Sequence, residues 1–425
     1  MRNEASSQID NSLNPVQALK GLRVCDLSGQ LAGAGSTRTL AAFGAEVIRI
    51  EDPVRQGRWD LLRGIPPFID SRRGIELGGA FNNHNVGKLG VTLNTRTARG
   101  KELLAELIAV SDVVTENFSA GVMESWGFTY ERMKEIRPDV IYVSNCGFGH
   151  SGPYRTFRTW GPIVQAVCGL TWSVGQGGER SGGFGYSYMD HHGANFMTFA
   201  ILSALHHRDQ TGEGQWIDMS AVEAGASMLG PDVLDWSING TPSRRAGRPN
   251  SNAGHSPAMS PHGIYPCRGD DEWVSIACRS DADWQILCTQ IDEPWAKEEH
   301  WVALSHRMER ASELDALLST WTSSRAKFDV EAQLLTSGIP AAAVTKPPER
   351  IDRDESTRAW GLFPETQHRE IGKVRVDGIP VHLSETDWHI EAGAPTLGQH
   401  NREVLCGLLG VTEAEFAELA ASNVI

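Results

Sequence analysis

The sequence lacks any segment that would carry the chain into or across a membrane. Its apolar runs are all shorter than the roughly 20 residues that span a bilayer. The first residues, Met1 to Pro15, are polar and contain no apolar core, so they do not have the pattern of a secretory signal. We therefore predict a cytoplasmic location, and we expect residues 1–18 to form a disordered N-terminal segment.

Paired thiol motifs are missing as well. The seven cysteines are scattered, their number is odd, and no Cys-x-x-Cys pair occurs. This pattern favours reduced thiols over a disulfide framework or a zinc site. The doublets His191-His192 and His206-His207 do not change that view, because adjacent side chains on a helix or strand point in different directions. We expect no bound metal.

Positive charge is scarce relative to negative charge. The sequence has 39 Lys and Arg residues against 53 Asp and Glu residues, for a formal net charge of -14. An excess of this sign argues against a nucleic-acid partner and against anionic membrane surfaces. It leaves open a local basic pocket for an anionic small molecule.

The chain does contain a regular alternation of strand-like and helix-like segments. The strand-like runs are Leu22–Leu27, Ala45–Ile50, Leu89–Leu93, Asp112–Glu116 and Val140–Asn145. Helix-like segments separate them, and the amphipathic stretch 97–110 is the clearest. This alternation predicts an α/β fold with a mainly parallel sheet.

The first predicted strand leads into a turn that carries Gly29, Gly33 and Gly35, then into a helix and a second strand. This βαβ unit resembles a dinucleotide-binding fingerprint, but its glycines do not have the G-x-G-x-x-G spacing. We therefore predict a Rossmann-like sheet without a regular NAD site. An NAD-dependent oxidoreductase stays open only as an alternative.

The composition changes at Asn239, where a stretch rich in Gly, Pro, Ser and Asn begins. Such a stretch is typical of a linker or a loop. A predicted hairpin over 263–278 and several helix-like segments follow it. We therefore predict a large Rossmann-like domain over 19–238 and 346–425, and a linker with a smaller α+β domain over 239–345.

A glycine-rich stretch places one carboxylate, Asp190, shortly before a long apolar run. Residues 182–193 are rich in glycine and carry Asp190, and the run from Phe196 to Leu205 predicts a buried helix. Asp190 would lie at or near the helix N-terminus, where the helix dipole favours an ionised carboxylate. On this evidence Asp190 is either a helix N-cap or a functional group.

Several of these signals occur together in one order. They are the segment 19–28 with 44–51, Glu116-Asn117-Phe118, 149–154 with 162–166, Asp190 with 211–215, 338–341, and 397–401. Together they resemble the class III coenzyme A transferases of the formyl-CoA and carnitine CoA-transferase type, from about Leu19 to about Leu409. The segments 160–162 and 186–191 look most like the benzylsuccinate CoA-transferase branch.

The resemblance implies an interlocked dimer of two-lobed subunits in which Asp190 is the catalytic residue. It implies CoA contacts at Gln30, Leu31, Leu93, Arg96, Asn117, Phe118 and Arg158. Arg96 and Arg158 are then the candidate cations for the CoA phosphates. The implied substrate pocket contains Trp160, Tyr186, Tyr188, Gly254 and His255, the last two in a candidate lid. Asp52 and Ser125 depart from the family, which often has basic residues at these positions.

The implied activity is the transfer of CoA from an acyl-CoA thioester to a carboxylic acid. It proceeds through mixed anhydrides and an aspartyl-CoA thioester, needs no tightly bound cofactor, and suits a bulky, aromatic or dicarboxylic acceptor. An α-methylacyl-CoA racemase of the same family is an alternative, although no histidine stands near Trp160 to act as its base. A non-catalytic subunit of a heteromeric transferase is another, so the partner is a second copy or a different chain.

Overall fold

A computed structural model describes residues 16–173, 186–241 and 258–425. Its contacts divide the chain into two compact units. The first comprises Met1–Leu170, Phe184–Leu229 and Thr357–Ile425, and the second comprises Thr171–Gly183 and Gly230–Ser356. The C-terminal segment therefore belongs to the same unit as the N-terminal one. Over the described residues, we find no helix with the length and apolar character to span a membrane.

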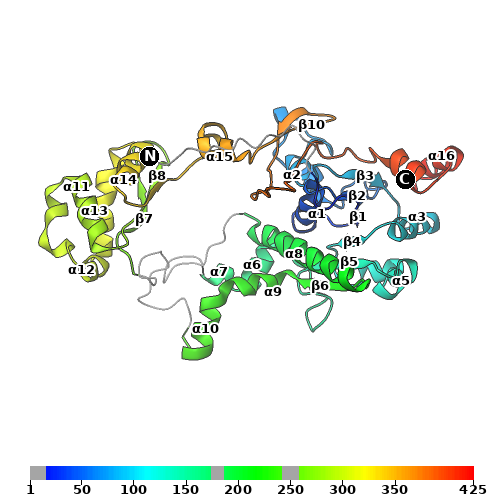
Figure 1. The fold of residues 1–425 in the computed structure, drawn as a ribbon, viewed down its shortest axis with the longest axis horizontal. Helices are drawn as coiled ribbons and strands as arrows, with labels where there is room; N and C mark the ends of the chain where they lie inside the picture. The colour runs from blue at the N-terminus through cyan, green and yellow to red at the C-terminus, as the bar shows by residue number, and fades with distance from the viewer. Residues whose placement is uncertain (1–15, 174–185, 242–257) are drawn as a thin grey trace. The chain divides into compact units, whose positions relative to one another are not determined.

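The first unit is built on a six-stranded sheet in which every pair of neighbouring strands is parallel (Figure 1). In spatial order the strands are β3 (Leu89–Thr92), β2 (Glu46–Glu51), β1 (Arg23–Asp26), β4 (Val113–Glu116), β5 (Ile141–Cys146) and β6 (Trp216–Ser220). This confirms the predicted α/β class. The chain order reverses between β1 and β4, and such switch points are where open α/β sheets bind ligands.

Helices cover both faces of this sheet, because its strands alternate between two apolar clusters. Val24 belongs to the cluster that also holds Leu40 of α1 (Ala32–Ala42) and Met197 of α8 (Tyr188–Thr211). Its neighbour Cys25 belongs to the cluster built on α3 (Ala98–Ala109), α5 (Tyr130–Ile136) and α16 (Glu413–Ala421). Successive side chains of a strand point to opposite faces, so β1 is buried on both sides.

The remaining helices of the first unit are short, and several flank the sheet's carboxyl end. They include α2 (Gly79–His84), α4 (Val122–Trp126), α6 (Gly161–Val167) and α9 (Ala221–Ala226). A small antiparallel pair, β10 (Glu365–His368) with β11 (Gly372–Arg375), lies in the C-terminal segment.

The segment 397–401 covers the edge strand β3. Gly90 N donates to His400 Nδ1 at 2.9 Å, and Thr92 N donates to Asn401 Oδ1 at 2.8 Å. An open strand edge invites pairing with other chains, so this covering protects the sheet. The motif Leu397–Asn401, which contributed to the family resemblance, thus has a structural role here.

The second unit has its own core. Its antiparallel sheet consists of β7 (His262–Pro266), β8 (Trp273–Ala277) and β9 (Ala341–Ala343), and the first two form the predicted hairpin. Its helices include α10 (Gly230–Asn239), α11 (Asp281–Ile291), α12 (Leu304–Glu309), α13 (Ala311–Ser323) and α14 (Lys327–Thr336). Trp284, Leu314 and Ile276 are fully or almost fully buried in one cluster, so this unit is an α+β body.

A buried ion pair fixes the carboxyl end of β1. Lys88 Nζ lies 3.2 Å from Asp26 Oδ2, and both side chains are 0% exposed. Lys88 Nζ also donates to Thr37 Oγ1 at 2.7 Å and to Asn85 Oδ1 at 3.0 Å. Burial lowers the pKa of Lys88 to about 8. Burial also opposes the Asp26 charge, but Lys88 and Arg49 outweigh it and hold the Asp26 pKa below its usual range.

Replacing Lys88 with methionine should destabilise the first unit strongly. The substitution removes the cation that is ion-paired with the buried Asp26 carboxylate, and breaking a buried pair in this way costs about 3–5 kcal/mol. Equilibrium urea denaturation of Lys88→Met against the parent protein measures the loss. Lys20→Met serves as the control, because Lys20 is exposed and should change the free energy of unfolding by no more than about 0.5 kcal/mol. Equal effects of the two substitutions would contradict the importance of the pair.

Candidate active site

Asp190 lies in the first turn of α8, the helix that the apolar run from Phe196 predicted. The N-cap of this helix is Ser187, so the alternative in which Asp190 is itself the N-cap is wrong. Asp190 N donates to Ser187 O at 3.1 Å, which closes the first turn. The carboxylate is therefore carried by a rigid helix and is free to serve another purpose.

The Asp190 carboxylate packs against a glycine of a second helix. Gly161 begins α6, preceded by Trp160 and followed by Pro162, whose fixed φ suits the first turn of a helix. A Cβ atom on Gly161 would lie 2.9 Å from Asp190 Oδ2 and 3.2 Å from both Cγ and Oδ1. Such distances are below van der Waals contact, so any residue with a side chain at 161 would displace the carboxylate.

The environment of Asp190 makes its carboxylate poorly solvated. Burial raises the pKa of Asp190, and a hydrogen bond with Ser187 opposes this only in part. Among the described residues, neither a lysine nor an arginine forms an ion pair with it. Burial therefore works against the ionisation that the helix N-terminus favours. A carboxylate that has lost water is a stronger nucleophile than a hydrated one.

Asp190 lines a cavity of about 390 Å³ at the carboxyl ends of β1, β4 and β5. That is within the size range of small-molecule sites, and it lies at the switch point of the sheet. The lining comes from the β1–α1 turn (Gln30, Ala32), the turn after β4 (residues 117–120), the end of β5 (residues 145–147), the loop 155–160, and Gly161, Val164, Asp190 and Ala221.

The cavity brings together many of the predicted site residues. Gln30, Asn117, Phe118, Arg158, Trp160 and Asp190 all line it. Leu31, Leu93, Arg96, Tyr186 and Tyr188 are not among its lining residues. Gly254 and His255 lie outside the described residues. The roles of all these residues in binding and catalysis stay predictions.

Two of the predicted residues have surroundings that suggest other uses. Tyr186 stacks on His191 with ring centroids 5.0 Å apart, and its hydroxyl lies 2.6 Å from His191 Nε2. The Asn117 side chain bonds both backbone groups of Gly29: it accepts from Gly29 N at 2.7 Å and donates to Gly29 O at 2.8 Å. Asn117 thus fixes the β1–α1 turn, and its side-chain groups are already committed.

Sequence reasoning missed several residues of this site. Arg155 lines the cavity together with Arg158, so two guanidinium groups are available there for an anion. Phe118 packs against Trp59 and Trp126, with centroids 5.2 Å and 5.4 Å away. Arg155 sits in the polar stretch after the glycine-rich turn 147–152, which is the only signal that could have found it.

No group of side chains suited to hold a metal ion occurs within the described ranges.

Residues 19–401 match the model of CoA-transferase family III. The chain belongs to this family. It is 31% identical to the formyl-CoA:oxalate CoA-transferase of Streptomyces coelicolor, covering 96% of this chain and 99% of the relative. It is 33% identical to the succinyl-CoA:mesaconate CoA-transferase of Haloarcula marismortui, covering 91% and 96%. A crystal structure of a CAIB/BAIF family protein from Brucella suis superposes with a TM-score of 0.83 at 30% identity, covering 92% and 99%.

Membership in family III confirms the resemblance inferred from the sequence motifs. It makes the protein a CoA-transferase, so the oxidoreductase alternative is set aside. The substrates of CoA-transferases are acyl-CoA thioesters, which carry anionic phosphates and an electrophilic carbonyl.

Substituting Gly161 with alanine should abolish most CoA-transferase activity without unfolding the protein. The added methyl group must push the Asp190 carboxylate out of place, and a displacement of this order costs about a hundredfold in kcat. Steady-state kinetics and circular dichroism of Gly161→Ala measure the two effects.

Gly193→Ala is the matched control for this experiment. Gly193 lies on α8 one turn after Asp190, and a Cβ there would meet only ordinary contacts, to Asn145 and Met219 at 3.9 Å. It should keep its activity and gain about 0.5–1 kcal/mol in stability, since alanine suits a helix interior better than glycine. Normal kcat in Gly161→Ala would contradict the packing argument.

Proposed function

We propose that Asp190 is the nucleophile that carries CoA from an acyl-CoA to a carboxylic acid. The observation that supports this most directly is the position of Asp190, the only carboxylate among the described residues that line the cavity. The second support is its poor solvation, which favours attack on an activated acyl group.

In the proposed first half-reaction, an Asp190 oxygen attacks the thioester carbonyl. The C–S bond breaks, CoA leaves as a thiolate, and the acyl group stays on Asp190 as a mixed anhydride. The thiolate then attacks Cγ of Asp190 and expels the donor acid as a carboxylate, which leaves an aspartyl-CoA thioester. Covalent catalysis of this kind divides one difficult transfer into easier steps.

The second half-reaction reverses these steps with the acceptor acid. Its carboxylate attacks Cγ of Asp190 and expels the CoA thiolate, which forms a second anhydride. The thiolate then attacks the acceptor's carbonyl carbon, which makes the new thioester and releases Asp190. No proton or redox partner is consumed, so the side chains need only bind, orient and exclude water. Arg155 and Arg158 are the proposed contacts for the CoA phosphates.

The proposed acceptor is a dicarboxylic or bulky aromatic acid. The two relatives described above are named for oxalate and mesaconate, and both of these acids are dicarboxylic. Phe157 and Trp160 line the cavity and are 55% and 52% exposed, so they offer apolar surface to a larger acid.

Other reaction types fit the cavity less well. A racemase needs a pair of acid–base groups, and none of the described residues that line the cavity is a histidine. His150 lies in an adjoining hollow beside Glu116 and Asp218, and its side chain is only 5% exposed. Cys146 lines the cavity, but burial raises the pKa of its thiol to about 11, so it is not a ready nucleophile.

Incubation with succinyl-CoA and other acyl-CoAs, followed by hydroxylamine, should label Asp190. Hydroxylamine captures both the anhydride and the thioester as a hydroxamate, which peptide mass spectrometry locates. We expect the hydroxamate on Asp190 in the parent protein and none in Asp190→Asn, with loss of transfer in the variant. Turnover by Asp190→Asn, or labelling at another residue with every donor, would refute the proposed nucleophile.

We further propose that the functional protein is a homodimer and that α8 contributes to its interface. Phe196, Phe199 and Leu202 follow one another at three-residue spacing along α8 and are 41%, 69% and 42% exposed. An exposed apolar row of this kind is typical of an interaction surface. A second copy of this chain is the occupant that the family resemblance implies.

A charge at Phe199 should dissociate this dimer. Phe199→Glu would bring an unpaired carboxylate into an apolar interface, which is strongly unfavourable. Analytical ultracentrifugation should show dimers for the parent chain and for Thr336→Glu, which adds the same charge to an exposed position of α14. A parent chain that sediments as a monomer at micromolar concentration would contradict the proposal.

A further inference from the structure

The β1–α1 turn holds Gln30 in a strained backbone conformation. Gln30 has a φ of 55°, in the left-handed region that residues other than glycine rarely adopt. Such a conformation persists only where the surroundings enforce it, and it is concentrated at functional sites. Since Gln30 lines the cavity beside Asp190, the contacts that hold its backbone also decide where its carboxamide lies.

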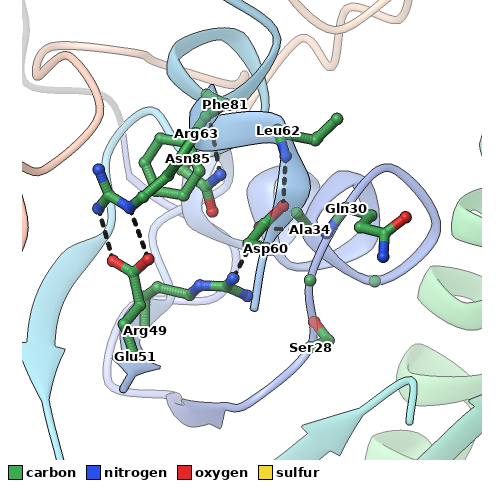
Figure 2. Close-up of polar contacts among 12 residues, drawn as sticks. Ser28, Gln30, Ala34, Arg49, Glu51, Asp60, Leu62, Arg63, Phe81 and Asn85 are labelled. Carbon is green, nitrogen blue, oxygen red and sulfur yellow. Dashed lines mark hydrogen bonds and ion pairs between the residues drawn. The ribbon is translucent and has the colours of Figure 1, made fainter. Parts of the chain in front are cut away.

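Two side chains from distant parts of the sequence hold this turn. Asn117 bonds both backbone groups of Gly29, as described above. Asp60 Oδ2 accepts a hydrogen bond from Gln30 N at 3.1 Å. In Figure 2 the Gln30 side chain points away from the Asp60 carboxylate, so Asp60 touches the backbone of this residue and leaves the carboxamide free for a ligand.

Asp60 is itself fixed from two further directions. Its Oδ1 accepts from Leu62 N at 3.0 Å, and its Oδ2 accepts from Arg49 Nη2 at 2.8 Å (Figure 2). The side chains of Asp60 and Arg49 are both 0% exposed. Gly29 lies beside the pair, because a Cβ there would be in ordinary van der Waals contact with both Arg49 Nη2 and Asp60 Oδ2, at 3.5 Å. The buried Arg49–Asp60 ion pair thus supports the β1–α1 turn from the protein interior.

Stability alone does not account for this pair. The Nε and Nη1 atoms of Arg49 are buried without a hydrogen-bond partner among the described residues. Buried unsatisfied donors are costly, and a buried ion pair is often no more stable than apolar side chains of the same size. A neighbouring pair, Glu51 with Arg63, is better satisfied, because Arg63 donates to both Glu51 oxygens and to Glu76.

We propose that Asp60, held in place by Arg49, is a positioning residue that acts on the transfer reaction through Gln30. Asp60 keeps the Gln30 backbone in the left-handed conformation and thereby aims the carboxamide into the cavity. There the carboxamide can donate a hydrogen bond to the thioester carbonyl or to the amide groups of the CoA arm. The inference rests on the proposed function in taking an acyl-CoA as the ligand of the cavity.

The test removes the pair without leaving a buried charge. Arg49→Met/Asp60→Leu replaces both partners with apolar side chains, and Gln30→Ala removes the carboxamide. We expect each to lower kcat/KM by about tenfold to a hundredfold. In the triple variant, kcat/KM should fall no further than in the more impaired of these two variants, because Asp60 acts through Gln30. Losses that multiply in the triple variant, or normal kcat/KM in the folded pair variant, would overturn the inference.

Glu51→Leu/Arg63→Met is the matched control. It removes the adjacent buried pair, which forms no hydrogen bond or ion pair with residues 28–30 in the described part of the chain and is not a part of the cavity lining. It should lower thermal stability at least as much as the Arg49→Met/Asp60→Leu variant does, because Arg63 makes more hydrogen bonds than Arg49, but keep the parental kcat/KM. A control that loses activity in parallel with the Arg49/Asp60 variant would show that both pairs only support the fold.

Hydrogen exchange supplies a readout that does not need activity. The amides of Gly29 and Gln30 should exchange faster in the Arg49→Met/Asp60→Leu variant than in the control, since their turn has lost an acceptor. If that variant does not fold, Asp60→Asn takes its place. An amide whose oxygen still caps Leu62 must lose both bonds that Oδ2 accepts, from Gln30 N and from Arg49 Nη2. Unchanged exchange at Gln30 would overturn the positioning role, whereas failure to label Asp190 would overturn only the proposed function.

Discussion

The site depends on the close packing of the Asp190 carboxylate against Gly161, where an added Cβ atom would lie only 2.9 Å from Asp190 Oδ2. It joins the first turns of α8 and α6, and it leaves no space for a Cβ atom on Gly161. Because α8 is long and packs under the sheet through Met197 and Ile201, its first turn cannot move away to relieve a clash. The position of the carboxylate is thus set by the fold and not by a flexible loop.

The residues around this contact exclude water from the Asp190 carboxylate. Burial raises the pKa of Asp190, and no lysine or arginine of the described chain neutralises it. The cations lie elsewhere: Arg155 and Arg158 line the outer cavity, and Lys88 and Arg49 lie in the interior beneath the turn that carries Gln30. In the proposed mechanism, this separation leaves the Asp190 carboxylate without a neutralising cation, which suits a nucleophile.

Much of the fold could be predicted because its signals are local. The alternation of apolar strands with amphipathic helices predicted the parallel sheet, and the apolar run from Phe196 predicted α8. The motif residues Gln30, Asn117 and Arg158 were predicted as site residues and do line one cavity. Capping by Asp190 was wrong, since Ser187 occupies that position. Helix ends depend on a few backbone angles, which the sequence predicts poorly.

The sequence by itself determined the fold class and the family, and it predicted Asp190 as the catalytic carboxylate. Strand periodicity and ordered motifs can be recognised without any knowledge of contacts. Only the tertiary structure decided what that carboxylate touches. In the sequence, Gly161 lies 29 positions before Asp190, and Asp60 lies 30 positions after Gln30. Neither relation has a periodic signature, since each joins side chains from separate elements that meet only when the sheet and its helices pack.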